Sequence, residues 1–235
     1  MSEEVKISEE NQFSFENPEY RKTYWHTCSH VLAQAVKRLW PEVKLAIGPS
    51  IDNGFYYDML APFSFTPENL AEIEAEMRKI CKEKLKLERF ELPREEAIKF
   101  MEEKGEPYKV ELIQDLPEDA PISFYKQGEF TDLCAGPHLD STGRVKGNAI
   151  KLLACNAAYW RGDSNRETLQ RIYGIAFPCP RPRKIRTAKR GSLPEIRRCG
   201  GMGVRVKTGE GNQGCKKGGT QRRGEMKSHI VSMIL

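Results

Sequence analysis

Histidine is scarce in this 235-residue sequence, which contains only four. No run approaches the ~20 apolar residues that a membrane-spanning helix needs, and the acidic, polar N-terminus is unlike a secretory signal or a transit peptide. The seven cysteines show no paired spacing, which argues against a disulfide framework and favours the reducing cytoplasm. With 39% hydrophobic and 30% charged residues, the chain is typical of a soluble globular protein.

Charge is divided unevenly along the chain. Residues 179–235 carry 15 Lys and Arg against 3 Asp and Glu, a net +12, which leaves −7 for residues 1–178. The same last stretch holds 10 of the 19 glycines and loses all hydrophobic periodicity. We therefore expect a poorly ordered lead-in over 1–22, a folded domain over 23–178 and an unstructured basic, Gly-rich tail over 179–235. The positive charge of the tail is compatible with nucleic-acid binding. Because the tail lacks aromatic residues that could stack on bases, we favour the interpretation that it is an adventitious C-terminus.

Periodicity within 23–178 predicts helices followed by short strands. We expect helices at roughly 24–40, from the Thr66-Pro67 start to about 87, and from Pro93 to Gly105. The expected strands cover 43–47, 54–58, 89–92, 108–113, 122–125, 130–133, 150–155, 158–160 and 169–177. This order favours an α+β fold, a mostly antiparallel sheet with helices packed on it.

Two of the four histidines, His26 and His30, lie four residues apart at the start of the first expected helix. Residues at that spacing share one helix face, so both imidazoles would point toward the same place. On its own such a pair is more often part of a packed core than a site.

A second short motif raises the expectation of a site. Cys134 and His138 are also four apart, but Gly136-Pro137 forbids a regular helix between them, so a tight turn must present them. If the two motifs converge, His26, His30, Cys134 and His138 match the ligand types and number of tetrahedral zinc. Without metal, the imidazoles would orient and deprotonate a water and Cys134 would shape the pocket. Both arrangements predict hydrolysis of an activated carbonyl.

Further polar residues are candidates for completing this site, each with a plainer interpretation. Asp132 could bind a substrate ammonium or orient an imidazole, or it could be a turn carboxylate. Lys109 could stabilise an oxyanion, or face solvent from a strand. Tyr57 could hydrogen-bond a substrate or simply pack. Arg161 could bind phosphate from a tight turn, or be an exposed turn residue.

At these motifs the sequence resembles the editing domain of bacterial threonyl-tRNA synthetases. The resemblance runs from about Tyr24 to Pro178 and is carried by five segments in the same order. They are His26–His30, Ala46–Asp58, Asp132–His138, Ala158–Asp163 and Leu169–Gly174. The spacing HxxxH…CxxxH is shared with alanyl-tRNA editing proteins, whereas the Ile-Gly-Pro and Tyr-Trp-Arg-Gly-Asp segments are similar to the threonyl branch.

The resemblance implies the editing-domain fold and hydrolysis of serine wrongly esterified to threonine tRNA, with the acceptor end of that tRNA as partner. It places His26, His30, Lys109, Cys134 and His138 in the catalytic site and Tyr57 and Asp132 on the substrate. It implies that no metal is required, although the alanyl branch binds zinc at this position.

The sequence departs from whole synthetases on both sides of the motifs. We find no motif of the class II catalytic core, so we expect a truncated synthetase without ligase activity. The alternatives are a non-catalytic tRNA-binding module, held by the basic tail, and an inactive remnant. No feature of the sequence gives the oligomeric state.

Overall fold

The structure is a computed structural model, and it describes residues 14–178. The expected tail over 179–235 and the first thirteen residues of the expected lead-in lie outside these described residues. Within them, no helix combines the length and the apolar character needed to cross a bilayer.

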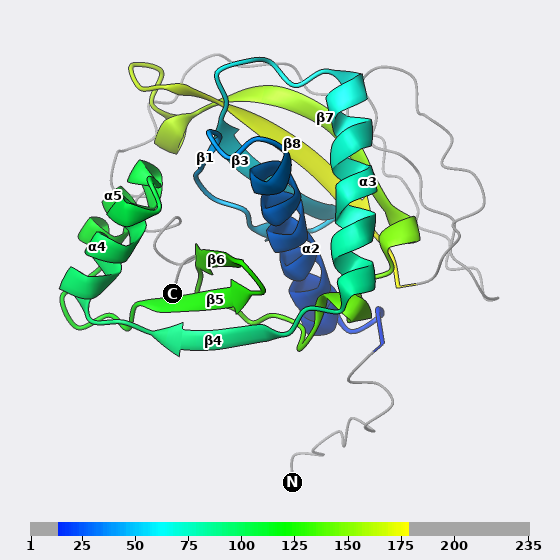
Figure 1. The fold of residues 1–235 in the computed structure, drawn as a ribbon, viewed down its shortest axis with the longest axis horizontal. Coiled ribbons are helices and arrows are strands. Elements are labelled where there is room, and N and C mark those ends of the chain that lie inside the picture. The colour runs from blue at the N-terminus through cyan, green and yellow to red at the C-terminus, as the bar shows by residue number, and fades with distance from the viewer. Residues whose placement is uncertain (1–13, 179–235) are drawn as a thin grey trace, which may run out of the picture.

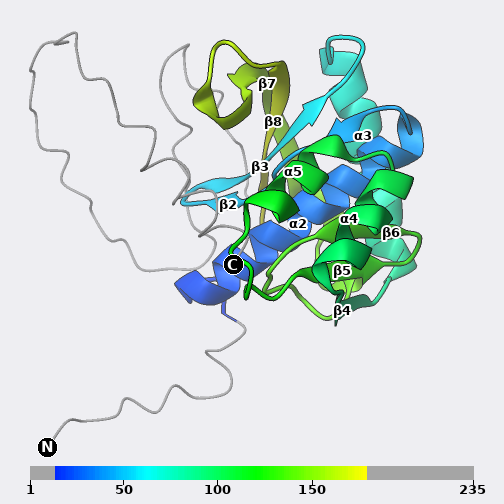
Figure 2. The ribbon, with the colours of Figure 1, turned by 90° about the vertical axis from the view of Figure 1, so that its left-hand side faces the viewer.

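Helix α2, Pro18–Leu39, occupies the middle of the molecule, between two antiparallel sheets (Figures 1 and 2). Asn17 caps it by accepting a hydrogen bond from the Glu19 N–H, with Pro18 in the first turn. The helix therefore starts earlier than the expected residue 24, and residues 18–22 are helical rather than part of a poorly ordered lead-in. The missed signal is the Asn-Pro pair.

The larger sheet has the strand order β1-β3-β8-β7, and β2 also pairs with β3. Its strands are β1 Lys44–Leu45, β2 Ser50–Ile51, β3 Gly54–Leu60, β7 Ile150–Tyr159 and β8 Thr168–Ala176. Residues 150–155 and 158–160, expected as two strands, belong to β7 up to Tyr159, and a register shift between Leu152 and Ala154 interrupts its pairing. All pairings in this sheet are antiparallel, as expected.

The smaller sheet has the order β4-β5-β6 and is also antiparallel. Its strands are β4 Leu87–Glu91, β5 Ser123–Gln127 and β6 Phe130–Leu133. Helices α4, Arg94–Glu103, and α5, Pro107–Asp115, share a buried core with this sheet. The expected α+β fold with antiparallel sheets and packed helices is confirmed.

Residues 108–113 form part of helix α5, so the expected strand there is wrong. The alternation of Tyr108, Val110 and Leu112 suggested a strand. However, Pro107 occupies the first position of a helix, where proline is favoured. The buried residues Tyr108, Leu112 and Ile113 also follow helical spacing. The correction matters for Lys109, which is buried on the helix and does not face solvent.

Helix α3, Pro67–Glu83, packs beside α2 and closes the main core against the larger sheet (Figure 1). It begins as predicted. The Thr66 hydroxyl accepts a hydrogen bond from the Asn69 N–H, and the Asn69 side-chain oxygen accepts one from the Thr66 N–H. It ends at Lys84, which adopts a left-handed conformation with φ 54°. Short 3-10 turns at Thr142–Arg144, Gly147–Ala149 and Trp160–Gly162 complete the elements.

Candidate active site

Helix α2 presents His26 and His30 from one face, as their spacing predicts. Their ring centroids are 5.3 Å apart and the rings are nearly perpendicular, at 88°. The helix is fixed against the end of β8, because the Trp25 indole N–H donates to the Ala176 carbonyl at 2.8 Å and the Tyr24 hydroxyl donates to the Phe177 carbonyl at 3.0 Å. The two imidazoles therefore project from a rigidly held segment.

The loop that follows β6 brings Cys134 and His138 to the same place. Cys134 continues the pairing with β5, since its N–H donates to the Ser123 carbonyl at 3.0 Å and the Ser123 hydroxyl donates to the Cys134 carbonyl at 2.8 Å. The chain then turns through Gly136, with φ +86°, and a cis bond to Pro137. A Cβ on Gly136 would lie 2.3 Å from the Tyr125 hydroxyl, so the turn leaves no room for a side chain.

The two motifs converge on one compact cluster. The Cys134 Sγ lies 3.3 Å from Nε2 of His26 and 3.2 Å from Nε2 of His138. The His138 ring centroid is 4.2 Å from that of His26 and 4.1 Å from that of His30. The sequence predicted that three imidazoles and a thiol would meet, and the structure brings these four groups together.

Burial keeps all four groups of the cluster uncharged near neutral pH. It lowers the pKa of His26 to about 4 and holds the pKa values of His30 and His138 well below that of a free imidazole, with neighbouring imidazoles adding to the effect for these two. Burial also raises the pKa of the Cys134 thiol to about 12. Three neutral imidazoles are therefore available to accept protons.

The donor set of this cluster fits a zinc ion. The ligand atoms of the four side chains all lie within 4.8 Å of one another, and Nδ1 of His30 is buried with no hydrogen-bond partner among residues 14–178. Tetrahedral zinc takes this mixture of imidazole nitrogen and thiolate sulfur. Binding would require Cys134 to lose its proton, which the metal itself promotes.

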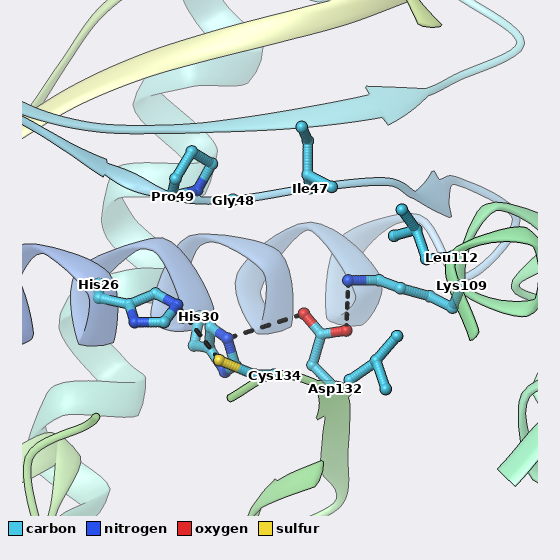
Figure 3. A pocket seen from close by; sticks show the side chains of 10 residues that line it. His26, His30, Ile47, Gly48, Pro49, Lys109, Leu112, Asp132 and Cys134 are labelled. Atoms are coloured by element: carbon cyan, nitrogen blue, oxygen red, sulfur yellow. Dashed lines mark hydrogen bonds and ion pairs between the residues drawn. The ribbon is translucent and has the colours of Figure 1, made fainter. Parts of the chain in front are cut away.

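A buried ion pair adjoins the cluster. The Lys109 Nζ lies 2.6 Å from Asp132 Oδ1, and both side chains are 4% exposed. The Tyr57 hydroxyl donates to Asp132 Oδ2 at 2.5 Å and accepts from Lys109 at 3.1 Å. Asp132 Oδ2 also lies 3.8 Å from His30 Nε2, so the ion pair and the imidazoles face each other across one space (Figure 3).

That space is a small pocket with an apolar wall. It has a volume of about 40 Å³, which is more than a single water molecule requires. The segment Ile47-Gly48-Pro49 runs along one side, opposite Asp132 and Cys134, with Lys109 and Leu112 at one end (Figure 3). The site can therefore hold a water beside a small polar group of a ligand.

Gly48 is required for this wall. A Cβ there would lie 2.1 Å from the Tyr57 ring. The Gly48 carbonyl lies 2.5 Å from the Ser29 hydroxyl on α2, which ties the wall to the histidine helix. Both residues lie inside segments that carry the sequence resemblance, but their structural roles were not predicted, because these roles depend on contacts with distant parts of the chain.

Three predicted site residues, Tyr57, His138 and Arg161, are not part of the pocket lining. Tyr57 and His138 contact lining residues, Asp132 and Cys134 respectively, whereas Arg161 is paired elsewhere. Its guanidinium pairs with Glu111 at 3.1 Å and with Asp115, both on α5. Glu111 is also held by Arg166 through two hydrogen bonds of 2.6 and 2.7 Å. Arg161 thus braces the helix that carries Lys109, and we infer no direct contact with substrate.

Thr27 and Glu106 are two further residues that sequence reasoning missed. Thr27 lies between the two histidines of α2, is fully buried, and its Oγ1 lies 3.3 Å from Nδ1 of His138. Glu106 precedes α5, accepts a hydrogen bond from the Leu45 N–H at 2.7 Å and pairs with Lys37 at 2.9 Å. The only available signals were a hydroxyl inside a helical His-x-x-x-His segment and a carboxylate beside a predicted helix end.

Comparison with known proteins finds threonine–tRNA ligases among the similar proteins. Residues 122–173 match the sequence profile of the threonyl and alanyl tRNA synthetase second additional domain. The chain is 70% identical over 164 residues to a threonine–tRNA ligase of Clostridium kluyveri, which covers 70% of this chain and 25% of that relative. It is 65% identical over 177 residues to the one from Clostridium tetani, covering 75% and 27%.

A threonine–tRNA ligase of Caldanaerobacter subterraneus subsp. tengcongensis is 64% identical over 177 residues, with 74% and 27% covered. The chain thus spans about a quarter of the length of the curated relatives that it matches. The predicted resemblance to the editing, or second additional, domain of threonyl-tRNA synthetases is confirmed.

Proposed function

We propose that this chain hydrolyses the ester bond of seryl-tRNA(Thr), releasing serine and intact threonine tRNA. The observation that carries the proposal is the convergence of His26, His30, Cys134 and His138 on one cluster. The first three of these side chains line a small pocket together with Lys109 and Asp132. The relatives are named as threonine–tRNA ligases, which supports tRNA as the partner.

The reaction class has a physical reason. Serine and threonine differ by one methyl group, which a binding pocket distinguishes by only ~1–3 kcal/mol. A second, hydrolytic pocket that admits serine and clashes with the additional methyl supplies the missing discrimination. The pocket is small, about 40 Å³, and Gly48 and Pro49 form part of its wall, which supports a site for a small side chain.

The histidines would accept the proton of the attacking water. Water adds its oxygen to the ester carbonyl carbon and gives a proton to a neutral imidazole, for which His26 and His138 are placed around Cys134. The bond from that carbon to the ribose oxygen then breaks, and the leaving ribose oxygen takes the proton back from the imidazolium to become a hydroxyl. The lowered pKa values keep these rings unprotonated and able to act as bases.

Lys109 would stabilise the negative charge that develops on the carbonyl oxygen. Within residues 14–178, its ammonium group uses two N–H bonds, to Asp132 and Tyr57, which leaves a third for the oxyanion. Asp132 holds Lys109 in place and retains lone pairs for the ammonium group of the seryl ester.

A bound zinc would be held by His26, His30, Cys134 and His138 and would supply Lewis-acid activation of water. We propose that the reaction does not require it. Dialysis of the full chain against a chelator should then leave the hydrolysis rate within about twofold. A loss that added zinc restores would assign the metal a part in the reaction.

Single-turnover hydrolysis of seryl-tRNA(Thr) by the full chain tests the proposal. His26→Ala and His138→Ala should each slow the reaction at least ~100-fold, as expected for acid–base groups. His229→Ala, which changes the one histidine outside the described residues, is the matched control and should retain the wild-type rate. Binding of tRNA without any turnover would instead favour a non-catalytic tRNA-binding module.

A further inference from the structure

We propose that Thr27 is a positioning residue whose hydroxyl selects one tautomer of His138, so that the lone pair of Nε2 points toward Cys134. Thr27 is completely buried on α2, between His26 and His30. It does not itself line the pocket, but its hydroxyl lies 3.3 Å from Nδ1 of His138.

Counting hydrogens at the Thr27 hydroxyl determines its role. The group has one proton and two lone pairs. Its Oγ1 lies 2.9 Å from the Thr23 carbonyl oxygen, which can only accept, so the proton is donated there. The Leu139 N–H, 3.0 Å away, can only donate, so it occupies one lone pair. What remains for Nδ1 of His138, at 3.3 Å, is the second lone pair.

It follows that Nδ1 of His138 carries the ring proton. If it did not, two lone pairs would face each other in a buried site, where an unsatisfied polar contact is costly. A neutral imidazole has a single N–H, so Nε2 is unprotonated. Nε2 is the atom that lies 3.2 Å from the Cys134 sulfur. Thr27 therefore makes the cluster-facing nitrogen a base.

The same bond fixes the orientation of the ring. The Leu139 N–H belongs to the residue after His138, so Thr27 anchors both the backbone and the side chain of this turn to α2. The Tyr125 ring packs edge-on against His138 from another side, with centroids 4.5 Å apart. Hydrogen-bonding partners behind a reactive or metal-binding imidazole commonly set its tautomer in this way.

The direct test is a long-range proton–nitrogen NMR spectrum of the ¹⁵N-histidine-labelled full chain near pH 7.5, where the rings are neutral. Protonated and unprotonated ring nitrogens have well-separated shifts, and loss of signals in His138→Asn assigns the ring. We expect wild type and Thr27→Ser to show a protonated Nδ1. In Thr27→Val the ring should redistribute between both tautomers. Thr23→Val is the matched control: its hydroxyl donates to Glu19 one turn earlier, away from the site, so it should change nothing.

The kinetic arm rests on the proposed deacylase function. Thr27→Val should lower kcat about 10- to 100-fold with KM changed less than about threefold, and Thr27→Ser should recover most of the rate. A wild-type spectrum with the proton on Nε2 would overturn the proposal, as would a Thr27→Val chain that keeps both tautomer and kcat. If Thr27→Val does not fold, the wild-type spectrum alone decides. Absence of hydrolysis by the wild type would refute the function and leave the tautomer test intact.

Discussion

Two groups of paired charges lie against α2, one beside His30 near the middle of the helix and one around Arg38 in its last turn, and they differ in burial. The pocket pair, Lys109 and Asp132, is 4% exposed on both sides and adjoins the histidines. The Arg38 cluster consists of Arg38 with Glu76, Glu83 and Glu129, where Arg38 is 24% exposed and Glu129 is 56% exposed. One group is buried beside a pocket, and the other lies at the surface where three elements meet.

The Arg38 cluster has the geometry of a surface brace. Arg38 binds Glu83 with two nearly parallel hydrogen bonds of 2.7 and 2.8 Å and reaches Glu129 at 2.6 Å. It thus joins α2 to α3 and to the turn between β5 and β6. Exposed pairs of this kind contribute little individually, and a network contributes somewhat more.

The pocket pair cannot be explained as a stabilising contact of this kind. Removing two charges from water costs free energy that their attraction seldom exceeds, so a buried pair is poor evidence of stabilisation. Buried charges that face a pocket and neighbouring titratable groups are instead typical of functional sites. The comparison teaches that burial and surroundings, rather than the number of ion pairs, distinguish a functional charge from a structural one.

The largest predicted effect comes from breaking the pocket pair. Lys109→Met leaves the Asp132 carboxylate buried without its cation and removes the proposed oxyanion contact. We expect a loss of stability of about 3–5 kcal/mol and hydrolysis slowed at least ~100-fold. Urea unfolding and single-turnover hydrolysis measure the two.

Lys109→Met combined with Asp132→Asn separates these effects. The neutral amide keeps an acceptor for the Tyr57 hydroxyl, so the double variant should regain stability relative to Lys109→Met while hydrolysis stays low. Recovery of the rate in the double variant would show that the pocket pair has only a structural role.

A second prediction uses acid to separate the histidines beside the pocket pair from the Arg38 cluster. Because burial lowers the pKa of His26 from 6.5 to about 4, and lowers those of His30 and His138, the folded state binds fewer protons than the unfolded chain in this range. Stability should therefore fall as pH drops from 6.5 toward 4. Pairing with Arg38 lowers the pKa of Glu129 from 4.5 to about 2. The stability that this pair contributes is therefore lost only as pH falls below 4.5.

Unfolding midpoints measured at closely spaced pH values test these windows. His26→Asn should flatten the fall between pH 6.5 and 4, and Arg38→Met should flatten only the fall below 4.5. If each variant altered the other's window, the two groups would not be independent.

The smallest predicted effect is that of Arg38→Met itself at neutral pH. Loss of a partly exposed network should cost about 1 kcal/mol, and hydrolysis should remain within about twofold of wild type. The same urea and single-turnover experiments apply. A large loss of activity in this variant would mean that the brace and the pocket are coupled through α2.

Much of the site could be predicted from local patterns. Helical spacing placed His26 and His30 on one face, and Gly136-Pro137 indicated a turn that presents Cys134 and His138. The Thr66-Pro67 start and the antiparallel strands followed from capping and turn chemistry in the same way. These features depend on neighbours within a few residues, which the sequence displays directly.

The rest depended on contacts between distant segments. Lys109 was expected on a strand because the side chains around it alternate between apolar and polar. Over so few residues this pattern is compatible with a strand or a helix, and tertiary packing selects one of them. Arg161 looked suited to a substrate phosphate because its partners, Glu111 and Asp115, lie about fifty residues earlier. The role of Thr27 depends on the loop that crosses it more than a hundred residues later. No local pattern reports such partners.

The central claim is that this pocket hydrolyses seryl-tRNA(Thr) selectively, and the most direct measurement compares two substrates. The ratio of kcat/KM for seryl-tRNA(Thr) to that for threonyl-tRNA(Thr), measured with the full chain, should exceed ~100, because the small pocket excludes the additional methyl. Equal rates on the two esters, or no release of serine at all, would contradict the account.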